Sequence, residues 1–419
     1  MTKVLVSFTA LLASVAILLV GHGLQLTLIP LYADQLVWDA ALIGYIGSSY
    51  YVGFMLGCFS IPALVARVGH IRVFAVLAAI ATASLLSLTA VEQLWFWMLA
   101  RVLTGWSIAG LYMVIESWLN EQAGTEQRGM VLSTYTVITL VGLCVGQLLI
   151  GLGIPYRDMF MLAAIFVVLS IIPVGLTASF APTPIPAVRF RLAGLLQASQ
   201  VAVVGAFIAG VVTSGFWALG PVVARANGLG TDQVGIFMAI TIAGGAVFQL
   251  PIGRLSDQYD RRYVIAAVAL LGVIVCTLAA FLAGRSTSLL YMMMFVFGAM
   301  TFPLYSLCLA HANDNTELPL MEIASGILMM TSAGAVLGPV LVGWLIDYNN
   351  LALFYVSGLA LLLLAAWTGY RIRFHDNTRE HFEPFVDVPR TTHEIVELMV
   401  DDCQSESSEQ RYNDDLPDR

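Results

Sequence analysis

The chain has 419 residues, of which 59% are hydrophobic and only 11% are charged, whereas a typical soluble domain has roughly 25% charged residues. A soluble globule could not cover its surface with so few charges, so the composition excludes a soluble enzyme, a nucleic-acid-binding protein and a disordered chain. A mean hydropathy of +0.86 indicates a polytopic membrane protein.

The net charge of −8 belongs to the C-terminal end of the chain. Residues 1–372 hold 14 basic and 14 acidic side chains, whereas residues 373–419 hold 5 basic and 13 acidic ones. An acidic segment repels phosphate groups, so we expect this end to bind neither nucleic acid nor anionic lipid.

Twelve apolar runs follow one another along the chain. A transmembrane helix needs about 20 apolar residues to cross a hydrocarbon core of roughly 30 Å. Runs of that length cover residues 4–33, 40–66, 71–91, 95–119, 129–152, 158–179, 196–225, 233–256, 263–284, 288–312, 321–346 and 351–372. The first run continues through His22, Gln25 and Pro30 without a small-residue cleavage site, so it predicts a membrane helix rather than a signal peptide. The sequence therefore predicts an all-α membrane protein with twelve transmembrane helices.

The basic residues indicate how these helices are oriented. If the N-terminus is cytoplasmic, the cytoplasmic segments hold Lys3, Arg67, Arg72, Arg128, Arg189, Arg191, Arg254, Arg261, Arg262, Arg371, Arg373 and Arg379. The opposite side then holds only Arg157, Arg225 and Arg285. Cytoplasmic loops carry an excess of Lys and Arg, so this bias predicts that both termini are cytoplasmic.

An internal repeat divides the chain into two halves. Glycines and prolines recur at an offset of 191 or 192 residues. The pairs are Pro30 with Pro221, Gly44 with Gly235, Gly53 with Gly244, Gly146 with Gly338, and Gly151 with Gly343. Because this offset spans six helices, an even number, both copies have the same orientation, as in the parallel repeats of secondary transporters.

The repeat also sets the expected domain boundaries. We expect an N-terminal six-helix bundle at residues 1–180 and a C-terminal six-helix bundle at residues 196–372. Three prolines between residues 180 and 191 disfavour a helix and predict an extended cytoplasmic linker at residues 181–195. Residues 373–419 form the expected acidic cytoplasmic tail.

Two sequence motifs connect these features with a known family. The loop after the eighth run reads Gly253-Arg-Leu-Ser-Asp257-Gln-Tyr-Asp-Arg261-Arg262, and the fourth run contains Arg101-Val-Leu-Thr-Gly105. Both segments resemble signature sequences of the major facilitator superfamily. The resemblance covers residues 1–372 and implies the major facilitator fold, in which two pseudo-symmetric six-helix bundles move a small solute across the membrane.

Three shorter segments narrow the resemblance to one branch. Val114-Ile-Glu116-Ser117, Gly146-Gln147-Leu-Leu and Pro251-Ile-Gly-Arg-Leu are similar to the YcaD-like bacterial branch of the superfamily. This branch is largely without assigned substrates, so the resemblance implies a transporter without naming its solute.

The loop that carries Asp257 is a candidate gate. A carboxylate at the end of the eighth helix can face the positive N-terminus of a neighbouring helix. The resemblance implies that this neighbour is the fifth helix, which begins near Arg128, and that Arg261 and Arg262 take part. Alternatively, the arginines only satisfy the positive-inside rule.

The corresponding loop after the second helix departs from the family. It keeps Arg67 and Arg72 as candidate gating residues, but Ala66 stands where the family has an aspartate. The two gates are therefore not expected to work alike.

Arg101 lies about two turns inside the fourth helix. A charged side chain within a span costs about 2.5–3.5 kcal/mol on insertion scales, so it is a functional candidate. The resemblance implies a role in proton transfer or in binding a substrate carboxylate. The alternative is an arginine that extends to the interface and binds carbonyl groups or water.

Glu116 lies on the same helix, 15 residues further along and roughly 22 Å from Arg101, so the two cannot pair. One interpretation makes Glu116 a protonatable coupling group. The other makes it a structural partner of Arg128 or Arg67 that replaces the missing aspartate.

Polar and aromatic residues within the spans are candidates for a substrate cavity. The resemblance implies that helices 1, 4, 7 and 10 line it, with contributions from their neighbours. The candidates are His22, Gln25, Tyr51, Trp106, Tyr112, Ser214, Trp217, Gln249 and Tyr305. Each could instead make only a hydrogen bond between helices. Because no dense cluster of acids is present, a polycationic substrate is disfavoured.

These observations favour a monomeric, proton-coupled secondary transporter in the bacterial inner membrane. The sequence shows no nucleophile with a base at one depth, no phosphate-binding loop and no metal-binding motif, so we expect neither an enzyme nor a cofactor. The expected partners are a small-molecule substrate, protons and the lipid bilayer. The alternative is a receptor or regulator that uses the same fold without transporting.

Overall fold

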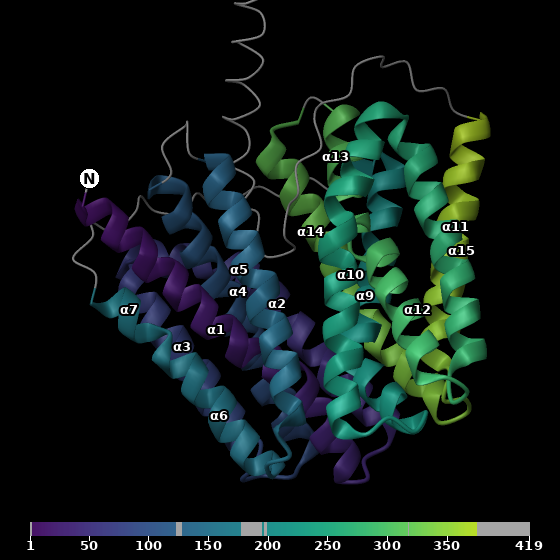
Figure 1. Ribbon diagram of the computed structural model, residues 1–419. Helices are drawn as coiled ribbons and strands as arrows, with labels where there is room; N and C mark the ends of the chain where they lie inside the picture. The colour runs from purple at the N-terminus through teal and green to yellow at the C-terminus, as the bar shows by residue number, and fades with distance from the viewer. Residues whose placement is uncertain (1, 123–127, 177–194, 197–198, 317, 375–419) are drawn as a thin grey trace, which may run out of the picture.

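The computed structural model describes the chain except residues 1, 123–127, 177–194, 197–198, 317 and 375–419. The predicted linker and tail therefore lie almost wholly outside the described residues, and the predicted domain boundaries remain predictions. Every element within the described residues is helical (Figure 1).

The helices form two groups. The N-terminal bundle contains α1 (Thr2–Gln35), α2 (Ala40–Val68), α3 (His70–Ser87), α4 (Leu94–Gln122), α5 (Arg128–Leu148), the 3₁₀ turn η2 (Leu149–Leu152), α6 (Tyr156–Leu169) and α7 (Ile171–Gly175). The C-terminal bundle contains α9 (Gln200–Ala226), α10 (Thr231–Gln258), α11 (Arg261–Leu282), α12 (Thr287–Thr301), α13 (Leu304–Asp314), α14 (Leu320–Ile346) and α15 (Ala352–Phe374). The described residues contain twelve helical segments long and apolar enough to cross a membrane, which confirms the predicted number.

Two of the twelve spans are divided into two α-helices, and the fifth ends in the 3₁₀ turn η2. The sixth consists of α6 and α7, and the tenth consists of α12 and α13. The break in the tenth span falls at Phe302 and Pro303. Proline has no N–H and clashes with the preceding turn, so a helix rarely continues through it unchanged. This break matters for the site, because Phe302 lines the central cavity.

The repeat seen in the sequence returns as equivalent helix crossings. In the N-terminal bundle, a Cβ atom on Gly53 of α2 would overlap the carbonyl oxygen of Val102 in α4. In the C-terminal bundle, a Cβ on Gly244 of α10 would overlap the carbonyl oxygen of Phe295 in α12. Small residues let the backbones of membrane helices approach closely. Gly53 and Gly244, which are 191 residues apart, therefore allow the equivalent close helix crossing in each bundle.

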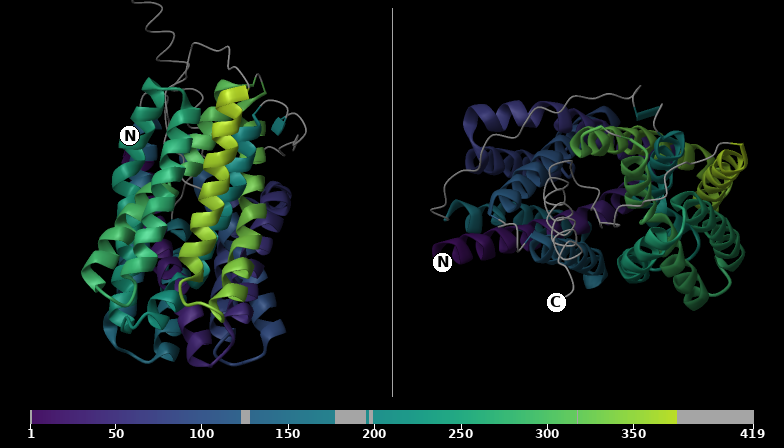
Figure 2. Two further views of the ribbon diagram at one scale, coloured as in Figure 1. Left: turned by 90° about the vertical axis from the view of Figure 1, so that its right-hand side faces the viewer. Right: turned by 90° about the horizontal axis from the view of Figure 1, so that it is seen from above.

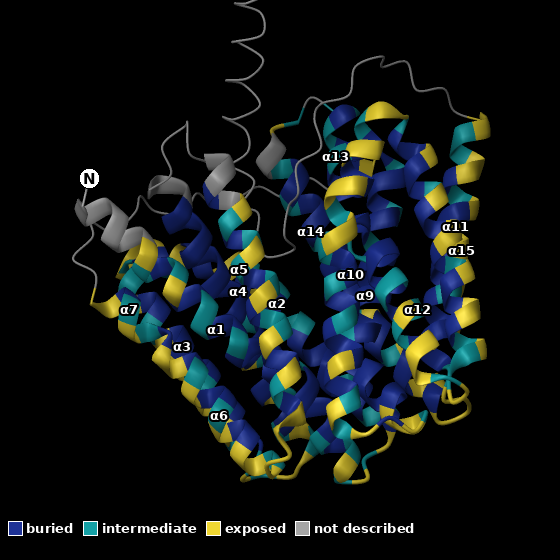
Figure 3. Ribbon diagram, viewed as in Figure 1, coloured by how far each residue is buried: buried dark blue, intermediate teal, exposed yellow. Residues whose placement is uncertain are grey.

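Side chains outside the bundle interiors are suited to lipid. Buried residues fill the inside of each bundle, and exposed ones lie on the outer faces (Figure 3). On α11 the exposed side chains include Leu271, Ile274 and Leu278, and on α15 they include Leu359 and Leu363. Apolar surface of this extent is stable against hydrocarbon rather than water.

The two bundles meet at one end of the molecule. They are in contact at the end opposite the start of α1 and stand apart at the other end (Figure 1), and the view from above shows them side by side (Figure 2). Ser48 of α2 donates a hydrogen bond to the carbonyl oxygen of Val336 in α14 at 2.6 Å. Trp344 Nε1 of α14 donates to the Tyr45 hydroxyl of α2 at 2.8 Å. We call this region, where α2 packs on α14 and α5 packs on α10, the closed end.

Candidate functional site

A cavity of about 230 Å³ lies between the two bundles. Eight transmembrane segments contribute to its wall, from α1, α2, α4 and α5 of one bundle and from α9, α10, α14 and the end of α12 in the other. The lining residues are His22, Leu26, Tyr50, Tyr51, Phe54, Tyr112, Thr136, Thr139, Leu140, Leu143, Thr213, Trp217, Ile242, Gln249, Phe302, Leu328, Thr331, Ser332 and Ala335. The wall is therefore shared by both bundles, so a movement of one bundle against the other would reshape it.

His22 is the centre of the N-terminal side of the wall. Its imidazole stacks on Tyr50 with ring centroids 6.1 Å apart and meets Tyr112 edge-on at 6.3 Å. The Gln25 amide nitrogen lies 2.7 Å from His22 Nδ1. An amide NH₂ group can only donate, so Nδ1 accepts and the proton of a neutral His22 lies on Nε2. Gln25 thus orients the ring and leaves Nε2–H as the donor.

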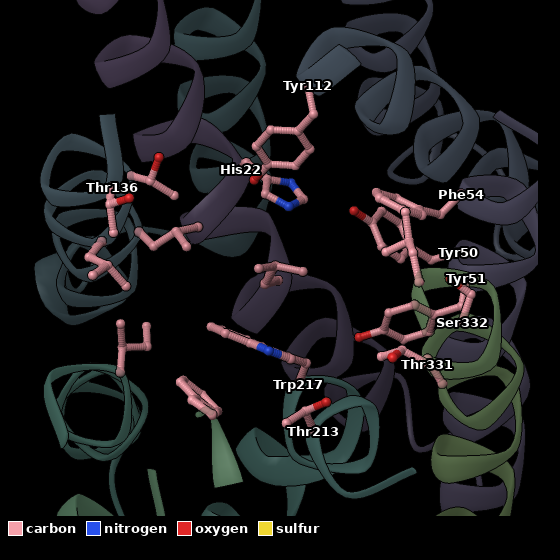
Figure 4. Close-up of a pocket in the computed structure, with 18 of the residues that line it drawn as sticks. His22, Tyr50, Tyr51, Phe54, Tyr112, Thr136, Thr213, Trp217, Thr331 and Ser332 are labelled. Atoms are coloured by element: carbon pink, nitrogen blue, oxygen red, sulfur yellow. The ribbon is translucent and has the colours of Figure 1, made fainter. Parts of the chain in front are cut away.

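The C-terminal side of the wall is built around Trp217 of α9. Its ring stacks on Phe302 with centroids 6.0 Å apart and an angle of 21° between the planes. The hydroxyls of Thr213 and Thr331 donate to carbonyl oxygens of their own helices, at Ala209 and Ile327. Trp217 and Phe302 therefore present aromatic surface to the cavity, as Figure 4 shows for Trp217.

The structure brings five of the nine predicted cavity residues to the wall. These are His22, Tyr51, Tyr112, Trp217 and Gln249. The other four do not line it. Gln25 lies behind His22, Trp106 donates to the Ser60 hydroxyl at 2.8 Å, Ser214 donates to the Val211 carbonyl at 3.3 Å, and Tyr305 is buried inside its own bundle.

The sequence analysis missed the hydroxyl residues of α5 and α14. Thr136, Thr139, Thr331 and Ser332 come from these helices. The resemblance pointed to helices 1, 4, 7 and 10 instead. The sequence did contain a sign of this polar face. Thr136 and Thr139 are three positions apart on an apolar helix, and residues i and i+3 share a face.

Arg101 of α4 lies beside the cavity rather than in its wall. Its guanidinium carbon is 4.5 Å from the centre of the Tyr50 ring, and its Nε and Nη1 atoms are buried without a hydrogen-bond partner in the described structure. It lines a smaller pocket of about 20 Å³ that shares Tyr50, Tyr51 and Trp217 with the main cavity and extends to Gly47. A pocket of this size holds about one water molecule, which could satisfy the guanidinium.

Glu116 is fully buried at the other end of α4. The Tyr135 hydroxyl of α5 donates to its Oε1 atom at 2.9 Å. Glu116 therefore ties α4 to α5 inside the N-terminal bundle. The side chain of Arg128, one of its two expected partners, lies outside the described side chains, and the other, Arg67, is exposed.

The candidate gate after α10 forms a charged network within the C-terminal bundle. Arg261 is 1% exposed, pairs through Nε with Asp314 of α13 at 2.5 Å, and pairs through Nη2 with Asp257 at 3.3 Å. Its Nη1 atom donates to the Ser256 hydroxyl at 2.8 Å. The network therefore joins the ends of α10, α11 and α13.

Arg262 pairs with a carboxylate of the same loop. Its Nη2 atom is 2.7 Å from Asp260 Oδ2, and its backbone N–H donates to Oδ1 at 2.9 Å, which caps α11. Burial alone would raise the pKa of the Asp260 carboxyl, but the hydrogen bonds and positive charge of Arg262 outweigh it. The pKa of Asp260 therefore lies below its usual value.

The equivalent region of the N-terminal bundle is built differently. His70 stands where the repeat has Arg261, and its Nε2 atom lies 3.2 Å from the Ser117 hydroxyl of α4. Arg67 and Arg72 are both exposed. The asymmetry expected from Ala66 therefore extends to its neighbours.

The described residues contain no group of three or more His, Cys, Asp or Glu side chains that could hold a metal ion.

Twelve spans in two bundles around a shared cavity define a membrane transporter of the two-bundle class. The sequence matches the Major Facilitator Superfamily over residues 11–194 and 202–394, and the chain belongs to that family. It is 27% identical over 366 residues to an uncharacterized MFS-type transporter of Enterobacter sp. (strain 638), covering 84% of this chain and 93% of the relative. It is also 27% identical over 372 residues to the uncharacterized MFS-type transporter YcaD of Salmonella arizonae, covering 84% and 94%. The predicted resemblance to the YcaD-like branch is confirmed.

Solved structures show the same fold. The nucleoside transporter NupG superposes with a TM-score of 0.73 at 16% identity, covering 88% of this chain and 99% of that one. A bacterial homolog of the human lysosomal transporter Spinster, in an inward-facing and occupied conformation, gives a TM-score of 0.70 at 16% identity, covering 87% and 96%. At these identities the likeness defines the fold and not the solute.

Proposed function

We propose that this transporter moves a small solute across the bacterial inner membrane by alternating access, with two six-helix bundles rocking about the central cavity. The observation that carries the proposal is the cavity itself, because its wall is shared by both bundles and lies next to the closed end. A site that both bundles share can face one side of the membrane at a time when the bundles tilt.

The positive-inside bias supports an orientation for this movement. It puts the start of α1 in the cytoplasm, so the closed end faces outward and the conformation faces inward. Transport then requires that the contacts of the closed end break while the cytoplasmic ends of the bundles approach. Arg67, Arg72, Arg128, Asp257, Arg261 and Arg262 are the proposed gating residues at those ends.

Proton coupling is the second part of the proposal. Arg101 and Glu116 are buried charged side chains of α4. Arg101 packs on Tyr50 in the cavity wall, and Glu116 accepts from Tyr135 between α4 and α5. Ionisable side chains within a membrane protein cost free energy to bury and are commonly parts of proton pathways.

We propose that the protein works as a monomer, since each bundle buries its own core.

Counterflow in liposomes tests the proposal. Purified protein is reconstituted into vesicles loaded with unlabelled solute, and uptake of the same labelled solute is followed. A carrier exchanges the two without any other energy source. Binding without exchange would contradict transport and favour the receptor or regulator that the sequence left as the alternative.

A further inference from the structure

Among the residues that line the main cavity, His22 is the one that could take up a positive charge near neutral pH. The lining residues include no Asp, Glu, Lys or Arg. Arg101 and Glu116 of α4 do not line this wall: Arg101 packs against Tyr50 and lines the small adjoining pocket, and Glu116 accepts from Tyr135. A charged solute would lose its hydration here without gaining a counter-ion in the wall itself, which is costly.

The cavity offers flat aromatic surface on both sides. His22, Tyr50 and Tyr112 form one side, and Trp217 with Phe302 forms the other. Figure 4 shows His22 and Tyr112 entering the cavity on the side opposite Trp217. An apolar cavity of about 150 Å³ holds benzene, so about 230 Å³ suits a solute of one or two rings.

Hydrogen-bonding groups are few and are spread around the wall. His22 presents Nε2–H as a donor, because Nδ1 is occupied by Gln25. Thr136 and Ser332 point into the cavity from opposite bundles (Figure 4). The Thr139 hydroxyl is buried without a hydrogen-bond partner in the described part of the chain. A ring with nitrogen and carbonyl groups on its edge would match these groups better than a hydrocarbon or a sugar.

We propose that the cavity selects an uncharged, planar nitrogen heterocycle, stacked between the tyrosine and histidine side and Trp217, and hydrogen-bonded at its edge by His22 and Thr136. This inference rests on the proposed transport function and adds the class of solute to it. Recognition by stacking tolerates different rings, whereas the neutral wall rejects their charged derivatives.

Matched solutes test the selection by charge. Nicotinamide and adenosine are uncharged. Nicotinate and 1-methylnicotinamide are charged relatives of nicotinamide, and adenosine 5′-monophosphate is a charged relative of adenosine. Thermal unfolding of the purified full chain is measured with each at pH 7. We expect at least one uncharged solute to raise Tm by roughly 3–5 °C at saturation, with no rise for its charged counterpart. A rise with the charged member equal to or larger than that of the neutral one, or no rise with any neutral heterocycle, overturns the proposal.

Matched variants test the residues. For the solute that binds, Trp217→Leu should weaken binding at least about fivefold, because one stacked ring is lost. Thr136→Val should weaken it about two- to tenfold. Trp95→Leu, at an exposed tryptophan, and Thr82→Val, whose hydroxyl bonds its own helix, are the controls and should bind normally. Normal binding by both Trp217→Leu and Thr136→Val would contradict the placement of the solute.

Counterflow with the same solutes separates this proposal from the proposed transport. Binding of a neutral heterocycle without exchange would support the class of solute and contradict the carrier. Exchange of a charged solute, with no response to neutral heterocycles, would support the carrier and overturn the class.

Discussion

Ser48 of α2 donates to the Val336 carbonyl oxygen of α14, and the repeat places an equivalent contact on the other side of the closed end. There, Cys144 Sγ of α5 lies 3.8 Å from the Ala239 carbonyl oxygen of α10. Ser48 and Ala239 are 191 residues apart, and Cys144 and Val336 are 192 residues apart. The closed end is therefore held by two related contacts between bundles, and both must break if the cavity is to open outward.

A disulfide across one of these contacts should stop transport. Ala239→Cys puts a second thiol opposite native Cys144 with one substitution. Oxidation should join α5 to α10, abolish counterflow and leave solute binding intact, and a reducing agent should restore exchange. The control is Ala239→Cys combined with Cys144→Ser. Full exchange by the cross-linked protein would show that the closed end does not open during transport.

Arg101 and Glu116 should matter more for proton-driven flux than for exchange. Arg101→Ala removes a buried cation, and Glu116→Gln keeps the hydrogen-bonding shape without the charge. We expect both variants to lose uptake driven by a pH gradient while keeping counterflow at a similar rate. Arg285→Ala, at an exposed arginine outside the cavity, serves as the control. Unchanged proton-driven flux in both test variants would contradict their role in coupling.

The pair of Asp260 and Arg262 should make stability depend on acid pH. The pKa of Asp260 is below the usual 3.8, so the pair stabilises the folded state above that pH and loses its contribution as pH falls through the lower folded-state pKa. Asp260→Asn keeps a side chain that can cap α11 but removes the charge that pairs with Arg262, so it should lose about 0.2–1 kcal/mol of stability at pH 7 and less at pH 3. Thermal unfolding at both pH values measures the difference, with Asp347→Asn at an exposed position as the control. If the stability lost in Asp260→Asn were larger at pH 3 than at pH 7, the pair would not stabilise the folded state in the way described.

The buried pair of Arg261 and Asp314 should be costly to break. Asp314→Ala leaves a guanidinium that is 1% exposed without its closest carboxylate, and removal of one partner of a buried pair costs about 3–5 kcal/mol. Asp257 and Ser256 still contact Arg261, so we expect the lower end of that range. The double variant Arg261→Met with Asp314→Leu should recover much of the loss in denaturant or thermal unfolding. If Asp314→Ala unfolds like the natural chain, the pair contributes little.

Hydropathy and spacing were sufficient to predict the twelve spans and the repeat. Gly53 and Gly244 could be paired by offset alone, because equivalent crossings need the same small residue. The cavity wall was harder to predict, because it depends on how each helix is rotated. Trp106 has the right depth but faces Ser60 of α2, and Tyr305 follows the break at Pro303, which turns it into the bundle.

The residues that the sequence failed to predict also depend on how the helices pack. Thr136 and Thr139 of α5 were not expected in the wall, yet they line it because α5 packs beside α1 and α10 at the bundle interface. The partner of Arg261 was also unpredictable, since Asp314 is 53 residues away and on another helix. Neither relationship leaves a signal in local sequence.

Paired distances across both ends of the molecule test alternating access most directly. Spin labels at Ile154 and Tyr348 report the closed end, and labels at Val68 and Tyr259 report the opposite end; all four positions are exposed. Double electron–electron resonance is measured in liposomes with and without a bound solute, and at two pH values. The account predicts that one distance lengthens while the other shortens. A single fixed distance at each end under every condition would contradict it.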